Sequence, residues 1–342
     1  MKSILRKIRK AIVPLALLVV RVIFRLMLGD ESFAQYVKKR VSPPIDVSPI
    51  NVPFAPPPNI IPDKLIGDFT LNREIPVLYF YLDSRVLDNQ AVVRNTRKKY
   101  KETFKQLDER SFSYYGNDMQ AFYDVMINYP FRDKTVLVWG LAGCNCEAMA
   151  VWNNAEKVYV VDYNKPICDH EKIEVLSHDE LESKQIRTDF AFSYSSFEHD
   201  GLGRYGDPIN PFGDIKAMSD AHRFLKQDGV LFLGVPLGKD CLCWNAHRIY
   251  GKHRLPLLLK GWQCLDVFDV NVIYTKNYPF DLPLGTHIQN LLALRKTDKD
   301  FPDNDILNVN TDEEKTTDRG KTCRLDVLKR INEIILNTKK YT

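Results

Sequence analysis

The chain has the length and composition of a globular protein with a weak overall charge. Its 342 residues are 44% hydrophobic and 27% charged, values typical of folded domains, and a chain of this length buries a sizeable core. Of its 48 Lys and Arg residues, seven lie in 1–25, where no acid occurs, so the rest of the chain carries 41 basic and 44 acidic residues. This balance excludes nucleic-acid binding by the body on electrostatic grounds.

The seven cysteines do not indicate a disulfide scaffold or a metal site. Their number is odd, and two pairs, at 144/146 and 241/243, have C-x-C spacing. Structural zinc sites use spacings of the C-x-x-C type. We therefore expect these cysteines to pack as small apolar side chains, with no bound metal.

Residues 1–28 combine a basic start with an apolar run. Residues 11–20 are uncharged and cover only about 15 Å as a helix, whereas the run to Leu28 is long enough to cross a bilayer, with Arg21 and Arg25 near its far end. The segment predicts a single-pass anchor with a cytosolic N-terminus, in the Golgi or endoplasmic reticulum. Because the cations share one side of a helix, an interfacial helix on the cytosolic face is the alternative. The absence of an N-x-[ST] sequon argues against a lumenal body.

A proline-rich segment follows, with eight prolines between Ser42 and Pro62. Such a segment cannot sustain a helix or a central strand. We predict that 29–71 is an extended stem, with a ligand for a proline-binding module as the alternative.

Residues 72–130 are predicted to form a largely helical extension of the body. The pattern indicates a strand over 76–82, a polar helix over 88–106 and a second helix over 116–129. Met119, Phe122, Tyr123 and Met126 repeat at helical spacing, which is more often a core stripe than a cofactor site.

Residues 135–162 have the layout of a nucleotide-binding unit. An apolar strand leads into a small-residue turn and a short helix, and a second strand ends at Asp162. The turn has two glycines, Gly140 and Gly143, and lacks the G-x-G-x-x-G pattern of dinucleotide sites. S-adenosylmethionine has no phosphate, so a two-glycine turn suits it better. We predict that the glycines approach its methionyl part and that Asp162, with Asn164 nearby, contacts the ribose hydroxyls.

The elements after this unit complete a sheet. Strands are predicted at 189–195 and 230–235, a helix at 215–225, and a closing antiparallel pair at 262–270 and 287–294. Strands that alternate with helices predict an α/β fold with a doubly wound, mostly parallel, Rossmann-like sheet over 131–298. Beyond it, 299–342 is predicted to be a polar tail with a short amphipathic helix.

Three strings resemble a known family. They are SYSSFEHDGLGRYGDPINPFGDI (193–215), FLKQDGVLFLGVPLGKD (224–240) and WNAHRIYGKHRLPLLLKGWQ (244–263). Together they resemble domain of unknown function 268, a family of methyltransferase-like proteins from nematodes. The second string, with S-S-F-E-H, is also similar to the fourth and fifth strands of class I S-adenosylmethionine-dependent methyltransferases. The resemblance covers 135–295 and implies their fold and cofactor class.

Methyl transfer to a hydroxyl requires an aligned acceptor and a proton acceptor. His199 is the candidate base, because its ordinary pKa is near neutrality, and Glu198 is a candidate to orient it. Four further residues are predicted to contact the substrate: Arg204, Asp207, His247 and Arg248. The alternatives are structural: an Arg204–Asp207 pair that holds the loop, and a surface turn at 247–248.

The sequence thus favours a membrane-tethered S-adenosylmethionine-dependent methyltransferase that acts on a polar, hydroxyl-type acceptor such as a glycan. The alternative is a non-catalytic binding or scaffold protein with the same fold. A glycosyltransferase is disfavoured, since no predicted strand ends on a D-x-D motif.

Overall fold

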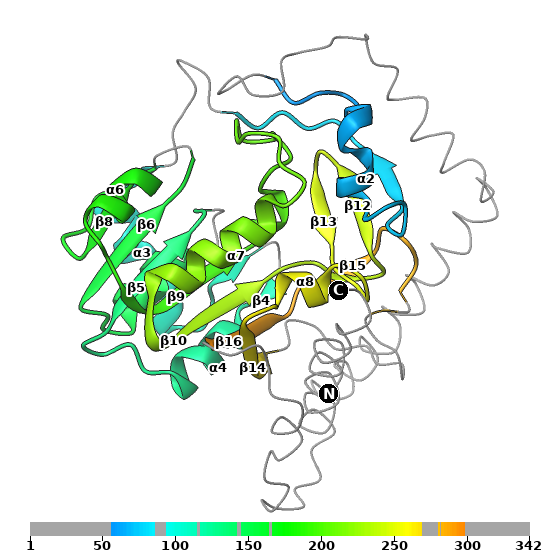
Figure 1. The fold of residues 1–342 in the computed structure, drawn as a ribbon. Helices are drawn as coiled ribbons and strands as arrows, with labels where there is room; N and C mark the ends of the chain where they lie inside the picture. The colour runs from blue at the N-terminus through cyan, green and yellow to red at the C-terminus, as the bar shows by residue number, and fades with distance from the viewer. Residues whose placement is uncertain are drawn as a thin grey trace, which may run out of the picture.

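A computed structural model describes residues 56–85, 94–114, 117–141, 145–163, 166–268, 280 and 282–297 (Figure 1). The predicted membrane segment, the stem up to residue 55 and the C-terminal tail lie outside these ranges and stay predictions. Among the described residues, no helix has the length and apolar character needed to span a membrane.

A seven-stranded sheet forms the centre of the body, in the order β14-β16-β10-β9-β5-β6-β8. The strands of its parallel part are β5 (Thr135–Trp139), β6 (Lys157–Val161), β8 (Ile173–Leu176), β9 (Thr188–Tyr194) and β10 (Leu225–Gly234). The chain starts in the middle at β5, runs outward through β6 and β8, and then returns to β9 on the other side of β5. The order of the strands therefore reverses between β5 and β9, which confirms the predicted doubly wound fold.

The sheet closes with an antiparallel pair, as predicted. β16 (Leu291–Lys296) pairs antiparallel with β10 and with β14 (Trp262–Phe268). The predicted strand at 287–294 is divided, because β15 (His287–Ile288) leaves the sheet to pair with β11 (Leu237–Gly238). β8 was not predicted. It has only four residues, and Glu174 within it faces Lys157 and Lys184 rather than the core.

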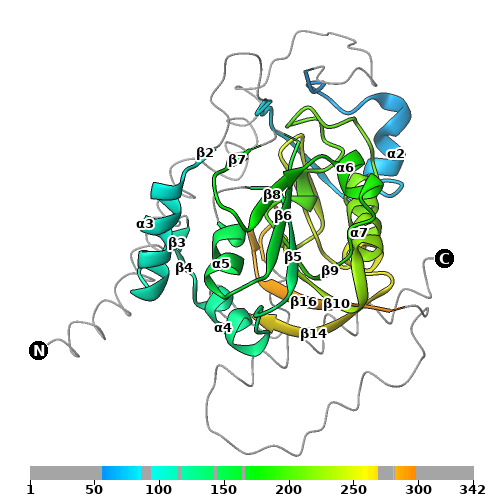
Figure 2. The same cartoon turned by 90° about the vertical axis from the view of Figure 1, so that its left-hand side faces the viewer.

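Helices cover both faces of the sheet (Figure 2). One face carries α3 (Arg97–Asp108), α4 (Gln120–Asn128) and α5 (Cys146–Trp152), and the other carries α6 (His178–Ser183) and α7 (Gly213–Phe224). Alternate residues of β5 enter different cores: Val136 and Val138 pack toward α3–α5, while Leu137 and Trp139 pack toward α6 and α7. This alternation follows from the two-residue period of a strand. The helix predicted at 88–106 begins later than expected, because the Thr96 side chain caps its first turn.

The described part of the proline-rich segment packs against the body instead of standing away from it. β1 (Val77–Tyr79) joins β12 (Cys241–Trp244) and β13 (His247–Ile249) in a small sheet. The Trp244 indole donates a hydrogen bond to the Pro58 carbonyl at 2.9 Å. Phe69 packs edge-on against Trp244, at 5.0 Å between ring centroids. For residues 56–71 the prediction of an extended stem is therefore wrong, because they pack on the apolar surface formed by Trp244 and its neighbours.

The remaining elements are short. They are η1 (Asp63–Leu65), α2 (Ile66–Phe69), β2 (Arg94–Asn95), β3 (Ser113–Tyr114), β4 (Asn117–Asp118), β7 (Ile167–Cys168), η2 (Phe197–His199) and α8 (Leu255–Leu258).

Candidate functional site

A cavity of about 860 Å³ opens at the carboxyl edge of the sheet, on the face covered by α6 and α7. Trp139 ends β5, Tyr163 follows β6, and His178 begins α6 just after β8. Asp200 and Gly201 follow β9 and η2, and α7 forms the opposite wall. In open α/β sheets, ligands bind beyond the carboxyl ends of the strands, near the point where strand order reverses. The cavity has this position.

Two aromatic side chains form one wall of the cavity. The rings of Tyr163 and His178 lie 5.5 Å apart, tilted by 34°. Burial, aided by the nearby carboxylates, raises the Tyr163 pKa, and burial lowers the His178 pKa, so both side chains are neutral at physiological pH. The Tyr163 residue nevertheless keeps 42% of its surface exposed. An exposed ring at this position can stack on a planar base.

The charged residues of the cavity wall are unevenly paired. Lys216 pairs with Asp220 at 2.6 Å, and Arg223 pairs with both Asp220 and Glu182. The carboxyl groups of Asp179 and Asp200 have no hydrogen bond or ion pair within the described part of the chain. Burial raises the Asp200 pKa well above its ordinary value, and Asp207 adds to the shift. The cavity therefore has a surplus of acidic groups.

The predicted cofactor residues Gly140 and Asp162 lie together beside this cavity. The Leu141 amide donates a hydrogen bond to Asp162 Oδ2 at 2.8 Å, and the Gly140 amide donates one to the Val161 carbonyl at 2.9 Å. Gly140 has a φ of +74°, and a Cβ built there would lie 2.5 Å from Ser196 Oγ. The glycine therefore serves a close approach of the chain's own Ser196, as well as a left-handed backbone. Gly143 and Asn164 lie outside the described residues.

His199 and Glu198, the predicted catalytic pair, are buried in η2. His199 Nδ1 donates a hydrogen bond to the Ala246 carbonyl at 2.6 Å, and His199 Nε2 lies 3.7 Å from Glu198 Oε1. Burial lowers the His199 pKa to about 3 and raises the Glu198 pKa to about 8, so both are neutral at pH 7. Neither residue lines the cavity. A base must reach the proton that it removes, and the structure does not bring His199 to the cavity.

The glycine-rich loop between η2 and α7 is held by Asp207. Its carboxylate accepts hydrogen bonds from the amides of Gly201 at 2.8 Å, Gly203 at 2.9 Å and Tyr205 at 3.1 Å. Arg204 instead donates to Ser84 Oγ at 3.2 Å. Asp207 was predicted to contact the substrate. Asp207 is only 5% exposed, and its carboxylate oxygens accept hydrogen bonds from its own loop, so it stabilises the loop and is not placed to contact a substrate. No Arg204–Asp207 pair forms.

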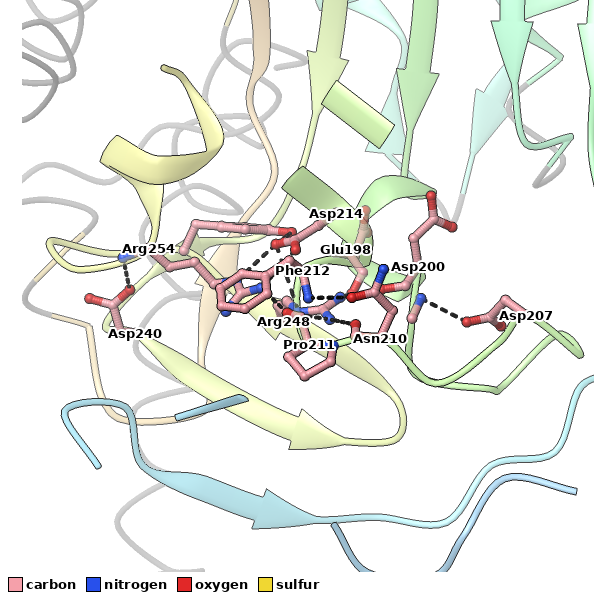
Figure 3. A network of polar contacts seen from close by, with 12 residues as sticks. Glu198, Asp200, Asp207, Asn210, Pro211, Phe212, Asp214, Asp240, Arg248 and Arg254 are labelled. Carbon is pink, nitrogen blue, oxygen red and sulfur yellow. Dashed lines mark hydrogen bonds and ion pairs between the residues drawn. The ribbon is translucent and has the colours of Figure 1, made fainter. Parts of the chain in front are cut away.

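Arg248 was also predicted to contact the substrate, and the structure places it in a buried network (Figure 3). The residue is 1% exposed, and its guanidinium donates to the backbone oxygen of Asp200 at 2.6 Å. Beside it, Arg254 donates two hydrogen bonds to the Asp214 carboxylate, at 2.7 and 2.8 Å, and Tyr250 donates a third at 3.0 Å. Buried charges are stable only when paired in this way. Arg248 therefore has no surface for a substrate.

His247 lies between two other histidines. Its ring is 6.3 Å from that of His199 and 5.3 Å from that of His287. Burial lowers its pKa to about 4. Among the described residues, no group of three or more His, Cys, Asp or Glu side chains is arranged to hold a metal ion.

The body of the chain matches a known protein family. Residues 133–290 match the model of a family described as "Caenorhabditis protein of unknown function, DUF268". This match confirms the resemblance inferred from the three strings. The first and third strings supply Asp214, Arg248 and Arg254, so the family motif builds the buried network. No curated protein is significantly similar to the chain.

Solved structures of similar fold include a 1,6-didemethyltoxoflavin-N1-methyltransferase from Burkholderia thailandensis with bound S-adenosylhomocysteine. It is 16% identical, with 64% of this chain and 99% of that chain covered and a TM-score of 0.41. A putative hemolysin from Streptococcus thermophilus is 12% identical (67% and 78% covered, TM-score 0.36). A putative S-adenosylmethionine-dependent methyltransferase from Listeria monocytogenes is 13% identical (52% and 98% covered, TM-score 0.35). These TM-scores are low, so the fold assignment rests on the strand order given above.

Sequence reasoning missed the cavity wall. Tyr163 directly follows Asp162, and Asp200 directly follows His199, so each lies one residue from a predicted site residue. A position just after a strand indicates that a residue lies at the carboxyl edge of the sheet. It does not indicate which of two neighbouring side chains faces the ligand.

Proposed function

We propose that the protein binds S-adenosylmethionine in the cavity between α6 and α7 and transfers its methyl group to a polar acceptor, with residues 1–28 holding it at a membrane. The observation that carries the proposal is the cavity itself, at the carboxyl edge of a doubly wound sheet and next to Gly140 and Asp162. Its volume of about 860 Å³ suits a cofactor together with a small acceptor.

The residues present fit an adenosyl group. Tyr163 and His178 offer neutral aromatic surfaces for the adenine. Asp162 precedes Tyr163 at the end of β6 and does not itself line the cavity, so its carboxylate would meet the ribose hydroxyls at the cavity's edge, beside its bond to the Leu141 amide. When bound, S-adenosylmethionine supplies a methyl group on a sulfonium centre that an aligned nucleophile displaces. The protein's part is to hold the two reactants in line and to exclude water. A hydroxyl acceptor, such as that of a glycan, would fit the polar walls.

A non-catalytic protein of the same fold is the second candidate, and a specific observation favours it. The space at Gly140 is occupied by Ser196, and the predicted acceptor residues Asp207 and Arg248 are bound to the chain itself. Such a protein would use the cavity to hold a ligand without transferring a group.

Calorimetry with S-adenosylmethionine on the full chain tests the proposal. We expect micromolar binding, with Tyr163→Ala weakening it by up to about tenfold, since stacking contacts contribute roughly 0.5–1.5 kcal/mol beyond burial. Tyr81→Ala is a matched control, because Tyr81 is 40% exposed and does not line the cavity. Absence of binding at millimolar ligand would reject the proposal, and equal losses in the two variants would reject the assigned position. Flotation with anionic vesicles, lost when 1–28 are removed, tests the membrane attachment.

A further inference from the structure

The Asp200 carboxyl group is the feature of the cavity that the proposed function leaves unexplained. It lines the cavity wall, and within the described residues it has neither a hydrogen bond nor an ion pair of its own. The neighbouring Arg248 donates to the backbone oxygen of Asp200 at 2.6 Å and not to its carboxyl group (Figure 3). An acidic group held in a cavity wall without a partner is costly unless it is neutral or meets a cation.

The surroundings of Asp200 are acidic overall. The charged or titratable groups that interact with it come from η2, the glycine-rich loop, α7, β13 and the end of β6: Glu198, Asp207, Asp214, Arg248 and Tyr163. Arg248 lies 3.7 Å from Asp214 and donates to four backbone oxygens, so its charge is already shared. Asp207 is occupied by loop amides. The one carboxyl group of this set that lines the cavity is Asp200.

We propose that Asp200 is the counter-ion for a positively charged centre of the bound ligand, and that it gives up its proton to solvent when that centre binds. The proposal rests on the proposed function, because the positive centre that it names is the sulfonium of S-adenosylmethionine. In the free protein, burial favours the protonated form of this carboxyl group, and the sulfonium supplies the charge that favours its ionisation. The carboxylate and the sulfonium then neutralise each other in the cavity.

S-adenosylmethionine and S-adenosylhomocysteine form a matched pair of probes. They share the adenosyl group and the amino acid, and they differ in the S-methyl group and its positive charge. Groups that respond only to the adenosyl or amino-acid part of the ligand affect both ligands alike, and the other acids of the wall are tested by the Asp179 variant below. A difference in their proton uptake therefore reports on the sulfonium and its counter-ion.

The experiment measures both ligands by calorimetry on the full chain, from pH 5 to 8, in buffers of different ionisation enthalpy. We expect S-adenosylmethionine to bind about tenfold more tightly, with release of up to about one proton, and its affinity to rise with pH until free Asp200 ionises. Asp200→Asn should remove the preference and the proton release while leaving S-adenosylhomocysteine affinity unchanged, which also shows that the variant is folded. Asp179→Asn, another acid of the same wall, should keep both effects.

Each result decides between the two proposals. Equal affinities for the two ligands in the parent protein, or a preference that survives in Asp200→Asn, would overturn the counter-ion and leave the proposed function standing. Loss of the preference in both variants would mean that the general field of the cavity is responsible, which also overturns it. If neither ligand binds the parent protein, the proposed function fails and the counter-ion fails with it.

Discussion

The cavity and the buried network lie side by side, yet they use charge in opposite ways. In the network, the Asp214 carboxylate is fully buried and receives hydrogen bonds from Arg254 and Tyr250. In the cavity, Tyr163 is exposed and the Asp200 carboxyl group lacks a partner among the described residues. The string at 193–215 contributes to both regions, since it supplies Asp214 to the network and Asp200 to the cavity wall. A specific sequence pattern therefore marks a segment of the chain, and the fold divides its residues between the network and the cavity.

The largest expected effect comes from breaking the network. Asp214→Asn should lower the free energy of unfolding by about 3–5 kcal/mol, because it leaves two buried guanidinium groups without a carboxylate. Burial opposes ionisation of Asp214, but Arg248 and Arg254 outweigh it and lower its pKa, so the charge is present in the folded state. Urea denaturation measures the change.

Lys216→Ala is the control for that variant. Lys216 lies on the same helix and pairs with Asp220, but its side chain is 67% exposed, so its loss should cost less than about 0.5 kcal/mol. Equal losses for the two variants would show that the network is not a distinct stabilising unit.

The loop that joins the two regions gives the next prediction. Gly201 has a φ of +82° and a Cβ there would overlap the Asn210 carbonyl oxygen, so Gly201→Ala should cost about 2–4 kcal/mol. Gly261 has the same φ, with nothing within 4 Å of a Cβ, so Gly261→Ala should cost only the backbone strain of about 1–2 kcal/mol. Thermal and urea unfolding compare the two. Similar values would mean that the loop relaxes around the added methyl group.

A smaller effect appears in the pH dependence of stability. Burial raises the Glu198 pKa to about 8 from its ordinary 4.5, so between these values the folded protein holds a proton that the unfolded chain has lost. The free energy of unfolding should therefore fall as pH rises through this window, by up to about 1.4 kcal/mol per pH unit. Glu198→Gln should remove that contribution. The contribution of Glu198 is best measured between pH 6.5 and 8, above the range in which His199 affects stability.

Below pH 6.5 the buried His199 acts in the opposite direction. Because its pKa is about 3 in the folded protein, the unfolded chain binds a proton in this range that the folded chain does not bind. The free energy of unfolding therefore falls as the pH decreases. If parent and Glu198→Gln have parallel stability curves between pH 6.5 and 8, then Glu198 is not protonated in the fold.

Much of the fold could be predicted because it depends on local pattern. The alternation of β5 into two cores, the turn at Gly140 and the acid that ends β6 follow from residue order along short segments. β8 escaped prediction because Glu174 interrupts its apolar pattern, and the end of the proline-rich segment was misassigned because its partner, Trp244, lies 186 residues away from Pro58.

By itself, the sequence determined the α/β class and the edge of the sheet where Gly140 and Asp162 meet, because strand periodicity and turn chemistry are encoded locally, and its three long strings gave the resemblance to the matched family. Only the tertiary structure decided which neighbours reach the cavity: Tyr163 and Asp200 do, and His199 does not. Adjacent residues of an irregular loop point in different directions, and their burial is set by distant segments such as the one that contains Ala246. The roles of side chains at this edge therefore depend on contacts that the order of residues does not reveal.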